Sequence, residues 1–222
     1  MPKAIALIPA FNEAERIGPV IEQARQYVSE VWVVDDGSVD NTASVSRQAG
    51  AKVVEHPKNL GKGAAILNGI EAVLQTDADL FIFLDADGQH DPREIPRFLE
   101  THEKSGATII LGNRMNDVRT MPLARKLTNY FMSWLLTRTA GQAIPDCSCG
   151  FRMLHRKAIA DMNLQTRNYE AEQEMLIKLS RKGHRIDSVP IATIYAGAPS
   201  KIRPVRDSIR FFKMLWRCRK SQ

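Results

Sequence analysis

The sequence lacks any long apolar segment. None of its apolar runs approaches the roughly 18–20 residues that a membrane-spanning helix needs. We expect no signal peptide, because Met1-Pro2-Lys3 leads directly into a short apolar stretch that is followed by Pro9 and Asn12. Low-complexity tracts and internal repeats are absent too. We therefore expect a cytoplasmic protein, and its 222 residues suffice for one domain with a sizeable core.

Cysteine is scarce. The three thiols, Cys147, Cys149 and Cys218, cannot all pair with one another. Cys147 and Cys149 lie too close together for the Cys-x2-Cys half of a zinc site, and no second pair exists. We expect free thiols in a reducing cytosol.

The net charge of +6 comes almost entirely from the C-terminus. Residues 201–222 contain eight Lys and Arg and one Asp, whereas residues 1–200 contain 23 Lys and Arg and 24 Asp and Glu. This distribution argues against a nucleic-acid-binding surface over the whole protein. It predicts instead one local anionic partner for the tail.

Short apolar segments alternate with helical patterns in the first half of the chain. Strands are predicted at residues 3–8, 31–34, 51–54, 80–84 and 108–111. Helices are predicted from Asn12 to about residue 27, after a cap at Asp40 or Asn41, after residues 59–63, and over 92–104. This alternation predicts right-handed βαβ units and hence an α/β fold with a mostly parallel sheet flanked by helices.

The pattern changes after residue 115. We predict a helix over 122–139, an additional strand over 150–154, a helix over 169–182 that is rich in carboxylates at its start, and one or two strands over 185–195. These elements are expected to decorate the sheet. The helix over 122–139 carries an apolar side from Leu123 to Leu135. Such a side more commonly packs against the core, and contact with a membrane is the alternative.

Residues 204–222 form a basic tail that predicts an amphipathic helix. Its apolar face would consist of Val205, Ile209, Phe212, Leu215 and Trp216, and its Lys and Arg side chains crowd the opposite face. Basic helices with aromatic residues are typical of membrane interfaces. We interpret the tail as a contact with an anionic membrane surface, and docking of the helix on the core is the alternative.

The most informative segment is the apolar run 80–84, which ends in Asp85 and Asp87. Carboxylates at the carboxyl end of a buried strand lie where open α/β sheets bind ligands. Their hard oxygen atoms suit Mg²⁺ or Mn²⁺ holding a diphosphate, and Gln89 could add a carbonyl oxygen. The alternative is that Asp-Ala-Asp-Gly only makes a turn.

Further acids follow the other strands. Glu13 follows the first predicted strand, and Asp35 and Asp36 follow the second. Carboxylates gathered on one edge repel one another unless a cation or a ligand rich in donors satisfies them. A nucleotide sugar would do both, because its ribose and base offer donors and its diphosphate brings the metal.

Other nucleotide-binding motifs do not fit. No Gly-x-Gly-x-x-Gly follows the first strand, which argues against a dinucleotide site. Gly61-Lys62-Gly63 lacks the upstream Gly and the following Ser or Thr of a P-loop. Lys62 could still approach a phosphate, or the two glycines could simply permit a tight turn.

Seven motifs in order resemble the family 2 glycosyltransferases of the GT-A-type fold. They are Pro9-Ala-Phe-Asn-Glu13, Asp35-Asp-Gly-Ser38, Asn59-Leu-Gly-Lys-Gly63, Asp85-Ala-Asp-Gly-Gln89, Gly112-Asn-Arg114, Asp146-Cys-Ser-Cys-Gly-Phe-Arg152 and Ser200-Lys201. The resemblance spans residues 4 to about 203 and is strongest to the dolichyl- and polyprenyl-phosphate mannosyl- and glucosyltransferases. It implies a single domain over 1–203, with a nucleotide-sugar half (1–115) and an acceptor half (116–203).

The resemblance also implies residue roles. Donor binding would involve Pro9, Phe11, Glu13, Val34, Asp36, Lys62, Asp85 and Ala86. The metal ligands would be Asp85, Asp87 and Gln89. Arg114 and Arg125 would meet phosphate groups, and Ser200 and Lys201 would lie near the acceptor phosphate. Arg152 could contact a ligand or form a salt bridge with Asp146.

The implied reaction inverts the anomeric carbon in a single in-line displacement. A metal would neutralise the leaving nucleoside diphosphate, and the protein would mainly position the reactants. A phosphate acceptor is already an anionic nucleophile, whereas a sugar hydroxyl needs a carboxylate base, for which Asp146, Glu172 and Glu174 are candidates. The catalytic set implied here is Asp87, Arg114, Asp146 and Glu172.

One segment departs from the lipid-phosphate enzymes. Their Arg-x-x-Gly-x-Ser-Lys stretch corresponds here to Tyr195-Ala-Gly-Ala-Pro-Ser-Lys201, so Tyr195 replaces the arginine and Arg203 or Arg206 would have to compensate. The acceptor therefore stays open between polyprenyl phosphate and a saccharide hydroxyl, as in cell-envelope polysaccharide synthesis. A GDP-mannose or UDP-glucose type of donor is equally open. A nucleotidyltransferase and a non-enzymatic membrane module are the more distant alternatives.

Overall fold

The core of the protein is one seven-stranded sheet. The computed structural model describes residues 3–116, 118, 121–166, 168, 170–192, 194 and 204–220. The strands are β1 (Ala4–Ala10), β2 (Glu30–Asp35), β3 (Lys52–Glu55), β4 (Leu80–Phe83), β5 (Ile109–Asn113), β6 (Arg152–His155) and β7 (Ile186–Pro190). Their order is β3-β2-β1-β4-β6-β5-β7, and all neighbours are parallel except the two pairs that contain β6. The predicted mostly parallel sheet is confirmed.

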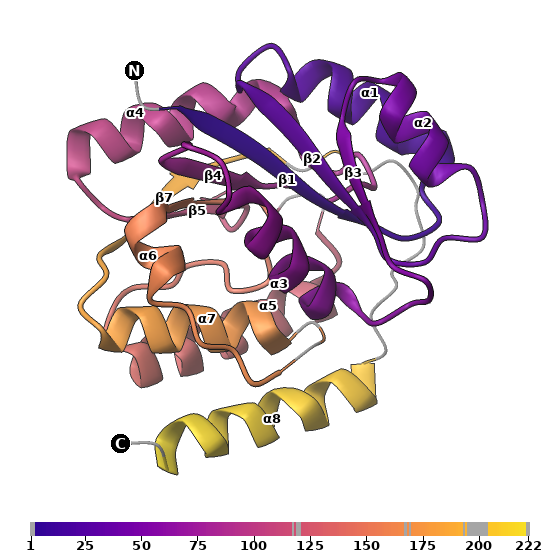
Figure 1. Ribbon diagram of the computed structural model, residues 1–222. Coiled ribbons are helices and arrows are strands. Elements are labelled where there is room, and N and C mark those ends of the chain that lie inside the picture. The colour runs from indigo at the N-terminus through magenta and orange to yellow at the C-terminus, as the bar shows by residue number, and fades with distance from the viewer. Residues whose placement is uncertain are drawn as a thin grey trace.

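Helices cover both faces of this sheet (Figure 1). They are α1 (Ala14–Ala24), α2 (Thr42–Gln48), α3 (Lys62–Val73), α4 (Ile95–Ser105, preceded by a 3-10 turn at Pro92–Glu94), α5 (Leu123–Ala140), α6 (Arg156–Ala160), α7 (Glu170–Arg181) and α8 (Pro204–Lys220). Alternate side chains of β1 serve the two faces. Ala6 and Ile8 pack with α1 and α4, whereas Ile5 and Leu7 belong to the cluster that contains α3, α5, α7 and α8.

The additional strand of the second half is β6, which lies between β4 and β5. It pairs antiparallel with both, so that Ile82 and Ile110 each lie opposite Met153. The predicted strand over 150–154 is confirmed, although it begins at Arg152. Among the described residues of the predicted region 185–195, only Ile186–Pro190 forms a strand.

The start of α1 differs from the capping prediction, whereas Asp40 caps α2 as predicted. Asn12 does not cap α1: its backbone is left-handed, with φ of 53°, and its amide oxygen accepts a hydrogen bond from the Val39 amide at 2.9 Å. Asp40 accepts hydrogen bonds from the amides of Ala14 (3.2 Å) and Thr42 (3.0 Å), the first residues of α1 and α2. One carboxylate therefore satisfies orphan donors at both helix starts.

The C-terminal helix α8 docks on the core, but not with the predicted face. It buries Phe211, Met214, Leu215 and Cys218, which follow an i, i+3, i+4, i+7 pattern. Of the predicted apolar face only Leu215 is buried, and the helix exposes the others whose burial is described: Ile209, Phe212 and Trp216. The helix thus has two apolar stripes, and the one that contacts the protein is not the one the sequence pattern favoured.

Helix α5 also differs from the expected core packing. Its exposed large apolar side chains are Leu123, Leu127, Tyr130, Phe131 and Trp134. Its inward side buries Asn129, Ser133 and Leu136 instead. No helix in the described ranges combines the length and apolarity that crossing a membrane would take.

Candidate active site

The acidic segments that follow three strands lie along one edge of the sheet. β1 pairs in parallel with β2 on one side and with β4 on the other, so the carboxyl ends of all three face the same way. Glu13, Asp36 and Asp85 follow these ends. Ligands of open α/β sheets bind at the point where the order of the strands reverses. In the order β3-β2-β1-β4 this point lies beside β1. We call Glu13, Asp36, Asp85 and Asp87 the strand-end rim.

Asp36 is a buried member of this rim that organises the loop before α3. Its carboxylate accepts hydrogen bonds from the amides of Leu60 and Gly61, both at 2.8 Å. His56 Nδ1 lies 2.7 Å from it, and the Asn68 amide nitrogen lies 2.9 Å from His56 Nε2. Asp36, His56 and Asn68 thus form one row of polar contacts.

Sequence analysis missed His56 and Asn68. The signal for His56 was available, because this residue directly follows β3 and therefore lies at the same edge as the other strand ends. Asn68 lies inside α3 and gave no such signal.

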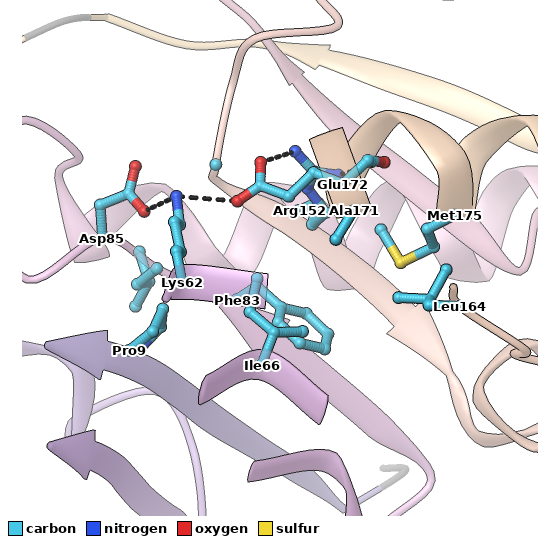
Figure 2. A pocket seen from close by; sticks show the side chains of 12 residues that line it. Pro9, Lys62, Ile66, Phe83, Asp85, Arg152, Leu164, Ala171, Glu172 and Met175 are labelled. Atoms are coloured by element: carbon cyan, nitrogen blue, oxygen red, sulfur yellow. Dashed lines mark hydrogen bonds and ion pairs between the residues drawn. The ribbon is translucent and has the colours of Figure 1, made fainter. Parts of the chain in front are cut away.

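The loop before α3 links Asp36 to Asp85. Gly61 adopts φ of 99°, a conformation that other residues rarely take, and this turn lets Lys62 begin α3. Lys62 Nζ lies 2.5 Å from Asp85 Oδ1 and 2.8 Å from Glu172 Oε1 (Figure 2). Three consecutive residues, 60–62, thus hold two acids of the rim and one acid of α7.

Glu172 is a second junction of charges. Its other oxygen, Oε2, lies 2.7 Å from Nη2 of Arg152, which is 2% exposed. Figure 2 shows the resulting row of alternating charges, from Asp85 through Lys62 and Glu172 to Arg152. Of the two alternatives predicted for Arg152, the salt bridge with Asp146 is therefore wrong: the guanidinium lies against α7, and Asp146 pairs with Arg114.

The carboxylate of Asp85 packs directly against Gly150, where a residue with a side chain would collide with it. A Cβ on Gly150 would lie 2.4 Å from Asp85 Oδ2, so only glycine allows this approach. Although burial opposes ionisation, the Lys62 ammonium holds the pKa of Asp85 well below its usual range. His90 Nδ1 lies 3.9 Å from Asp85, and burial lowers the pKa of His90 to about 4, so the ring is neutral at pH 7.

Asp87 is in a different electrostatic state. Burial and the nearby negative charge of Asp85 raise the pKa of Asp87, and its carboxylate accepts a hydrogen bond from the Gln89 amide at 3.0 Å. A raised pKa marks a carboxylate that a further cation would stabilise. Within the described part of the chain, no three His, Cys, Asp or Glu side chains form a ready metal cage. The two carboxylates of Asp85 and Asp87 do fit Mg²⁺ or Mn²⁺, because sites for these ions commonly combine one or two carboxylates with the phosphates of a substrate.

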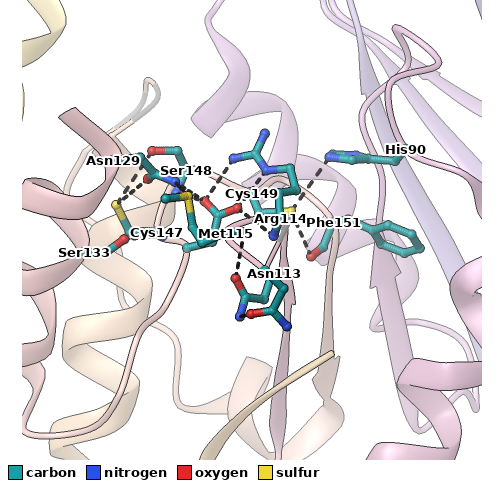
Figure 3. Close-up of polar contacts among 12 residues, drawn as sticks. His90, Asn113, Arg114, Met115, Asn129, Ser133, Cys147, Ser148, Cys149 and Phe151 are labelled. Atoms are coloured by element: carbon teal, nitrogen blue, oxygen red, sulfur yellow. Dashed lines mark hydrogen bonds and ion pairs between the residues drawn. The ribbon is translucent and has the colours of Figure 1, made fainter. Parts of the chain in front are cut away.

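Arg114 and Asp146 form a buried bidentate pair; Figure 3 shows Arg114 near Asn113, Met115 and Cys149. Arg114 Nε and Nη2 donate to the two carboxylate oxygens at 2.7 and 2.9 Å, and Asn129 of α5 donates to the same carboxylate at 2.9 Å. Burial acts against the charge of Asp146, but these hydrogen bonds keep the pKa of the carboxyl below its usual range. Asp146 is therefore a weak proton acceptor.

The cysteines near this pair are inert. Burial raises the pKa of Cys149 to about 12 and also raises that of Cys147, so both are protonated thiols at pH 7. Cys147, Cys149 and Cys218 are all unpaired and buried, which confirms the prediction of free thiols.

The other predicted site residues have diverse environments. Pro9 lines the pocket of Figure 2 together with Lys62 and Asp85. Glu13 is buried and lies 3.1 Å from Arg16. Phe11 is half-buried after β1, whereas the side chains of Val34 and Ala86 are buried in the core clusters.

The predicted acceptor-side residues are less concentrated. Arg125 is exposed on the first turn of α5, and Ser200 and Lys201 lie outside the described residues. Glu174 accepts hydrogen bonds from the amides of Gln165 and Thr166 and pairs with Lys178. This network is separate from the charges around Asp85 and Glu172.

Comparison with known sequences agrees with the family resemblance of the seven motifs. The family-wide pattern described as "Glycosyl transferase family 2" matches residues 5–162. UDP-N-acetylglucosamine--dolichyl-phosphate N-acetylglucosaminyltransferase of Methanococcus voltae is 28% identical over 212 residues, which covers 85% of this chain and 84% of that protein. Undecaprenyl-phosphate mannosyltransferase of Micrococcus luteus is 27% identical over 205 residues, with 86% and 84% coverage.

A solved structure shares the fold. Glucosyl-3-phosphoglycerate synthase from Mycobacterium tuberculosis, in complex with Mg²⁺ and UDP, superposes with a TM-score of 0.74 at 22% identity. The superposition covers 98% of this chain and 79% of that one. At this identity the likeness establishes the GT-A-type architecture and nothing more specific.

Proposed function

Because this chain belongs to glycosyltransferase family 2 and is a glycosyltransferase, we propose that it moves a hexose from a nucleoside diphosphate sugar to a polyprenyl phosphate, with Mg²⁺ or Mn²⁺ and with inversion at the anomeric carbon. The observation that carries the proposal is the strand-end rim. Loop residues 60–62 join Asp36 to Asp85, so that one loop organises both the nucleoside end and the diphosphate end of a donor site.

On the donor side, residues 1–115 would hold the nucleotide sugar. Asp85 and Asp87, with Gln89, would hold the metal, and the metal would neutralise the charge of the leaving diphosphate. Pro9, Phe11 and Glu13 would border the nucleoside. Asp36 would act on the ribose side chiefly by fixing the loop, because its oxygens already accept two amide hydrogen bonds. Lys62 would face the diphosphate once a metal takes over Asp85.

On the acceptor side, within residues 116–203, the charge pairing favours an anionic acceptor. All three candidate bases carry cations: Asp146 has Arg114, Glu172 has Lys62 and Arg152, and Glu174 has Lys178. A carboxylate that is bound to a guanidinium is a poor base for a sugar hydroxyl. A phosphate monoester needs no such base, since it arrives deprotonated, and Arg114, Arg125, Ser200 and Lys201 are the groups we assign to its recognition.

The proposed acceptor requires contact with a membrane. The named relatives from Methanococcus voltae and Micrococcus luteus act, by their names, on dolichyl and undecaprenyl phosphate. We propose that this protein likewise works at the cytoplasmic face of a membrane, as a peripheral protein. The acceptor lipid would then be drawn from the bilayer while the nucleotide sugar arrives from the aqueous side.

The donor test is calorimetry with UDP and GDP, each with and without Mn²⁺. One nucleotide should bind far more tightly than the other, and only with metal, because the diphosphate completes the coordination of the ion. Asp85→Asn should remove the metal dependence. Weak, equal and metal-independent binding of both nucleotides would refute the proposed donor site.

The acceptor test is transfer of radiolabelled hexose from the preferred nucleotide sugar. Polyprenyl phosphate should yield a labelled lipid, and polyprenol, which lacks the phosphate, is the matched control. Label appearing on an oligosaccharide in place of the lipid phosphate would favour the hydroxyl-acceptor alternative.

A further inference from the structure

Two helices of the outer layer expose an unusual number of large apolar side chains. They are Leu123, Leu127, Tyr130, Phe131 and Trp134 on α5, and Ile209, Phe212 and Trp216 on α8. These eight side chains are 46–68% exposed and include five aromatic rings. Among the other described residues, the exposed large apolar side chains are Val39, Leu60 and Ile194, which lie in separate loops. Gathered apolar side chains of this kind indicate an interaction site.

The two helices are held together as one layer. α7 contacts both α5 and α8, and nearly all of its side chains are buried. Arg181, the last residue of α7, donates from one guanidinium to the carbonyl of Cys218 in α8 and to that of Thr139 in α5, the latter at 3.4 Å. Figure 1 shows α5, α7 and α8 gathered on the side of the molecule remote from α1 and α2.

The same two helices carry the positive charge of the protein. Together they contain nine Lys and Arg and one Asp, whereas the rest of the chain contains 22 Lys and Arg and 24 Asp and Glu. Exposed basic side chains flank the apolar ones: Arg125 and Arg138 on α5, and Lys213, Arg217 and Arg219 on α8.

We propose that the outward faces of α5 and α8 form one composite surface that binds an anionic lipid bilayer. Apolar and aromatic side chains would enter the interface, and the surrounding basic side chains would meet lipid phosphates. The charge decides against a second copy of the chain as occupant, because a symmetric pair would bring two strongly positive surfaces together. Helix α8 alone forms only half of this surface, and α5 supplies the other half.

The surface lies one helix away from the candidate active site. The inner side of α5 donates from Asn129 to Asp146 and accepts the Cys147 amide at Ser133 Oγ. Its outer side carries Phe131 and Trp134. An α-helix is about 10 Å across, so a bilayer on the outer side would lie close to the Arg114–Asp146 pair. This inference deepens the proposed function, but it can be tested without donor or acceptor.

The test is flotation of the full chain with vesicles of phosphatidylglycerol and phosphatidylcholine, compared with phosphatidylcholine alone. The protein should float with the anionic vesicles and be released by salt. Phe131→Ser with Trp134→Ser on α5, and Ile209→Ser with Phe212→Ser on α8, should each weaken partitioning by about tenfold or more. Val39→Ser is the matched control, because Val39 is 91% exposed on a distant loop, and it should float like the wild type.

The charge contribution is tested separately. Arg138→Gln with Lys213→Gln should weaken partitioning by about fivefold for each charge removed. Lys157→Gln on α6, an exposed lysine outside the surface, is the control and should have no effect.

Several outcomes would overturn the inference. One is unchanged flotation of the α5 variant, which would mean that α8 binds the bilayer without α5. Another is equal binding to neutral vesicles. A third is a wild-type dimer that the apolar variants convert to monomers without any change in flotation. Metal-dependent nucleotide binding, measured on the same variants, should stay intact; if it is absent in the wild type while flotation behaves as expected, the proposed function fails and the membrane surface stands.

Discussion

The strand-end rim and the outer layer of α5 and α8 handle charge in opposite ways. In the row from Asp85 through Lys62 and Glu172 to Arg152, beside the rim, opposite charges are partly or fully buried and matched inside the protein. In the outer layer, the sequences of α5 and α8 contain nine Lys and Arg and one Asp, and the basic side chains of Arg125, Arg138, Lys213, Arg217 and Arg219 are exposed. The acids near the rim therefore have counterions within the protein, and a small ligand can replace these counterions one at a time. The positive charges of the outer layer instead face an extended partner outside the protein.

This difference predicts different sensitivities. A buried charge that loses its partner stays desolvated, so a single substitution near the rim should alter stability or ligand affinity strongly. An exposed charge is already solvated, so its removal should affect only the partner outside the protein.

The largest effect is expected for the Arg114–Asp146 pair. Asp146→Asn leaves a buried guanidinium without its counterion, and the free energy of unfolding should fall by about 3–5 kcal/mol. Urea denaturation measures it. The control is Asp161→Asn, whose half-exposed carboxylate lies 2.9 Å from His184 Nε2, and which should cost less than about 1 kcal/mol. Equal losses in the two variants would contradict the contrast between buried and exposed pairs.

The same pair fixes a pH dependence. The pKa of Asp146 is lower in the folded protein than the unfolded value of about 4, so as the pH falls the unfolded chain takes up the proton first. The stabilisation is complete above about pH 4 and is lost below it. The stability difference between the wild type and Asp146→Asn should therefore shrink as the pH is lowered past this value, and a constant difference would exclude the ionised pair as its source.

The next effect concerns Gly150. In Gly150→Ala the new methyl group would lie 2.4 Å from Asp85 Oδ2 and displace the carboxylate, so Mn²⁺-dependent nucleotide binding should weaken by about tenfold or more. Calorimetry measures the affinity. Gly18→Ala is the control, because its methyl group would meet Val45 at an ordinary 3.5 Å inside α1. Wild-type affinity in the Gly150 variant would remove Asp85 from the metal site.

A smaller effect of opposite sign is expected at Lys62. Its ammonium occupies Asp85 and Glu172 without a metal, so it competes with a divalent ion for the same carboxylate. Lys62→Met should bind Mn²⁺ about tenfold more tightly in the absence of nucleotide, since one nearby positive charge is removed. Electron paramagnetic resonance of free Mn²⁺ measures the change. Lys58→Met, an exposed lysine of the preceding loop, should bind as the wild type does; weaker binding by the Lys62 variant would show that the ammonium does not compete.

The smallest effect is expected in the outer layer. Lys213→Gln should change the free energy of unfolding by less than about 0.5 kcal/mol, because this side chain is exposed on α8. Thermal unfolding in buffer without vesicles measures it. A large loss of stability would mean that the basic side chains hold α8 on the core, and the comparison between the two regions would fail.

Much of the fold was predictable because it follows from local pattern. Apolar runs of strand length alternate with helical periodicity as far as β5, and this alternation alone requires crossover connections and parallel strands. The antiparallel orientation of β6 was not predictable, because a short apolar segment carries no mark of its direction. Helix α8 shows a different limit: the sequence contains two apolar stripes, and both satisfy the periodicity of a helix.

The candidate site was predictable as a set of positions but not as a set of partners. Carboxylates after strands β1, β2 and β4 must share an edge once the strands are parallel. Sequence spacing does not say that Lys62 meets Glu172, 110 residues further along, or that Arg152 prefers Glu172 to Asp146. His56 could have been found by the strand-end argument, whereas Asn68 could not.

By itself, the sequence determined the class of fold, the order of the motifs and the edge on which the acids gather, because periodicity and strand ends are local properties of a chain. The tertiary structure alone decided which charges neutralise one another and which apolar stripe faces the core. These outcomes depend on contacts between distant segments, where the cost of burying a charge or exposing a ring is set by the neighbours that folding brings together.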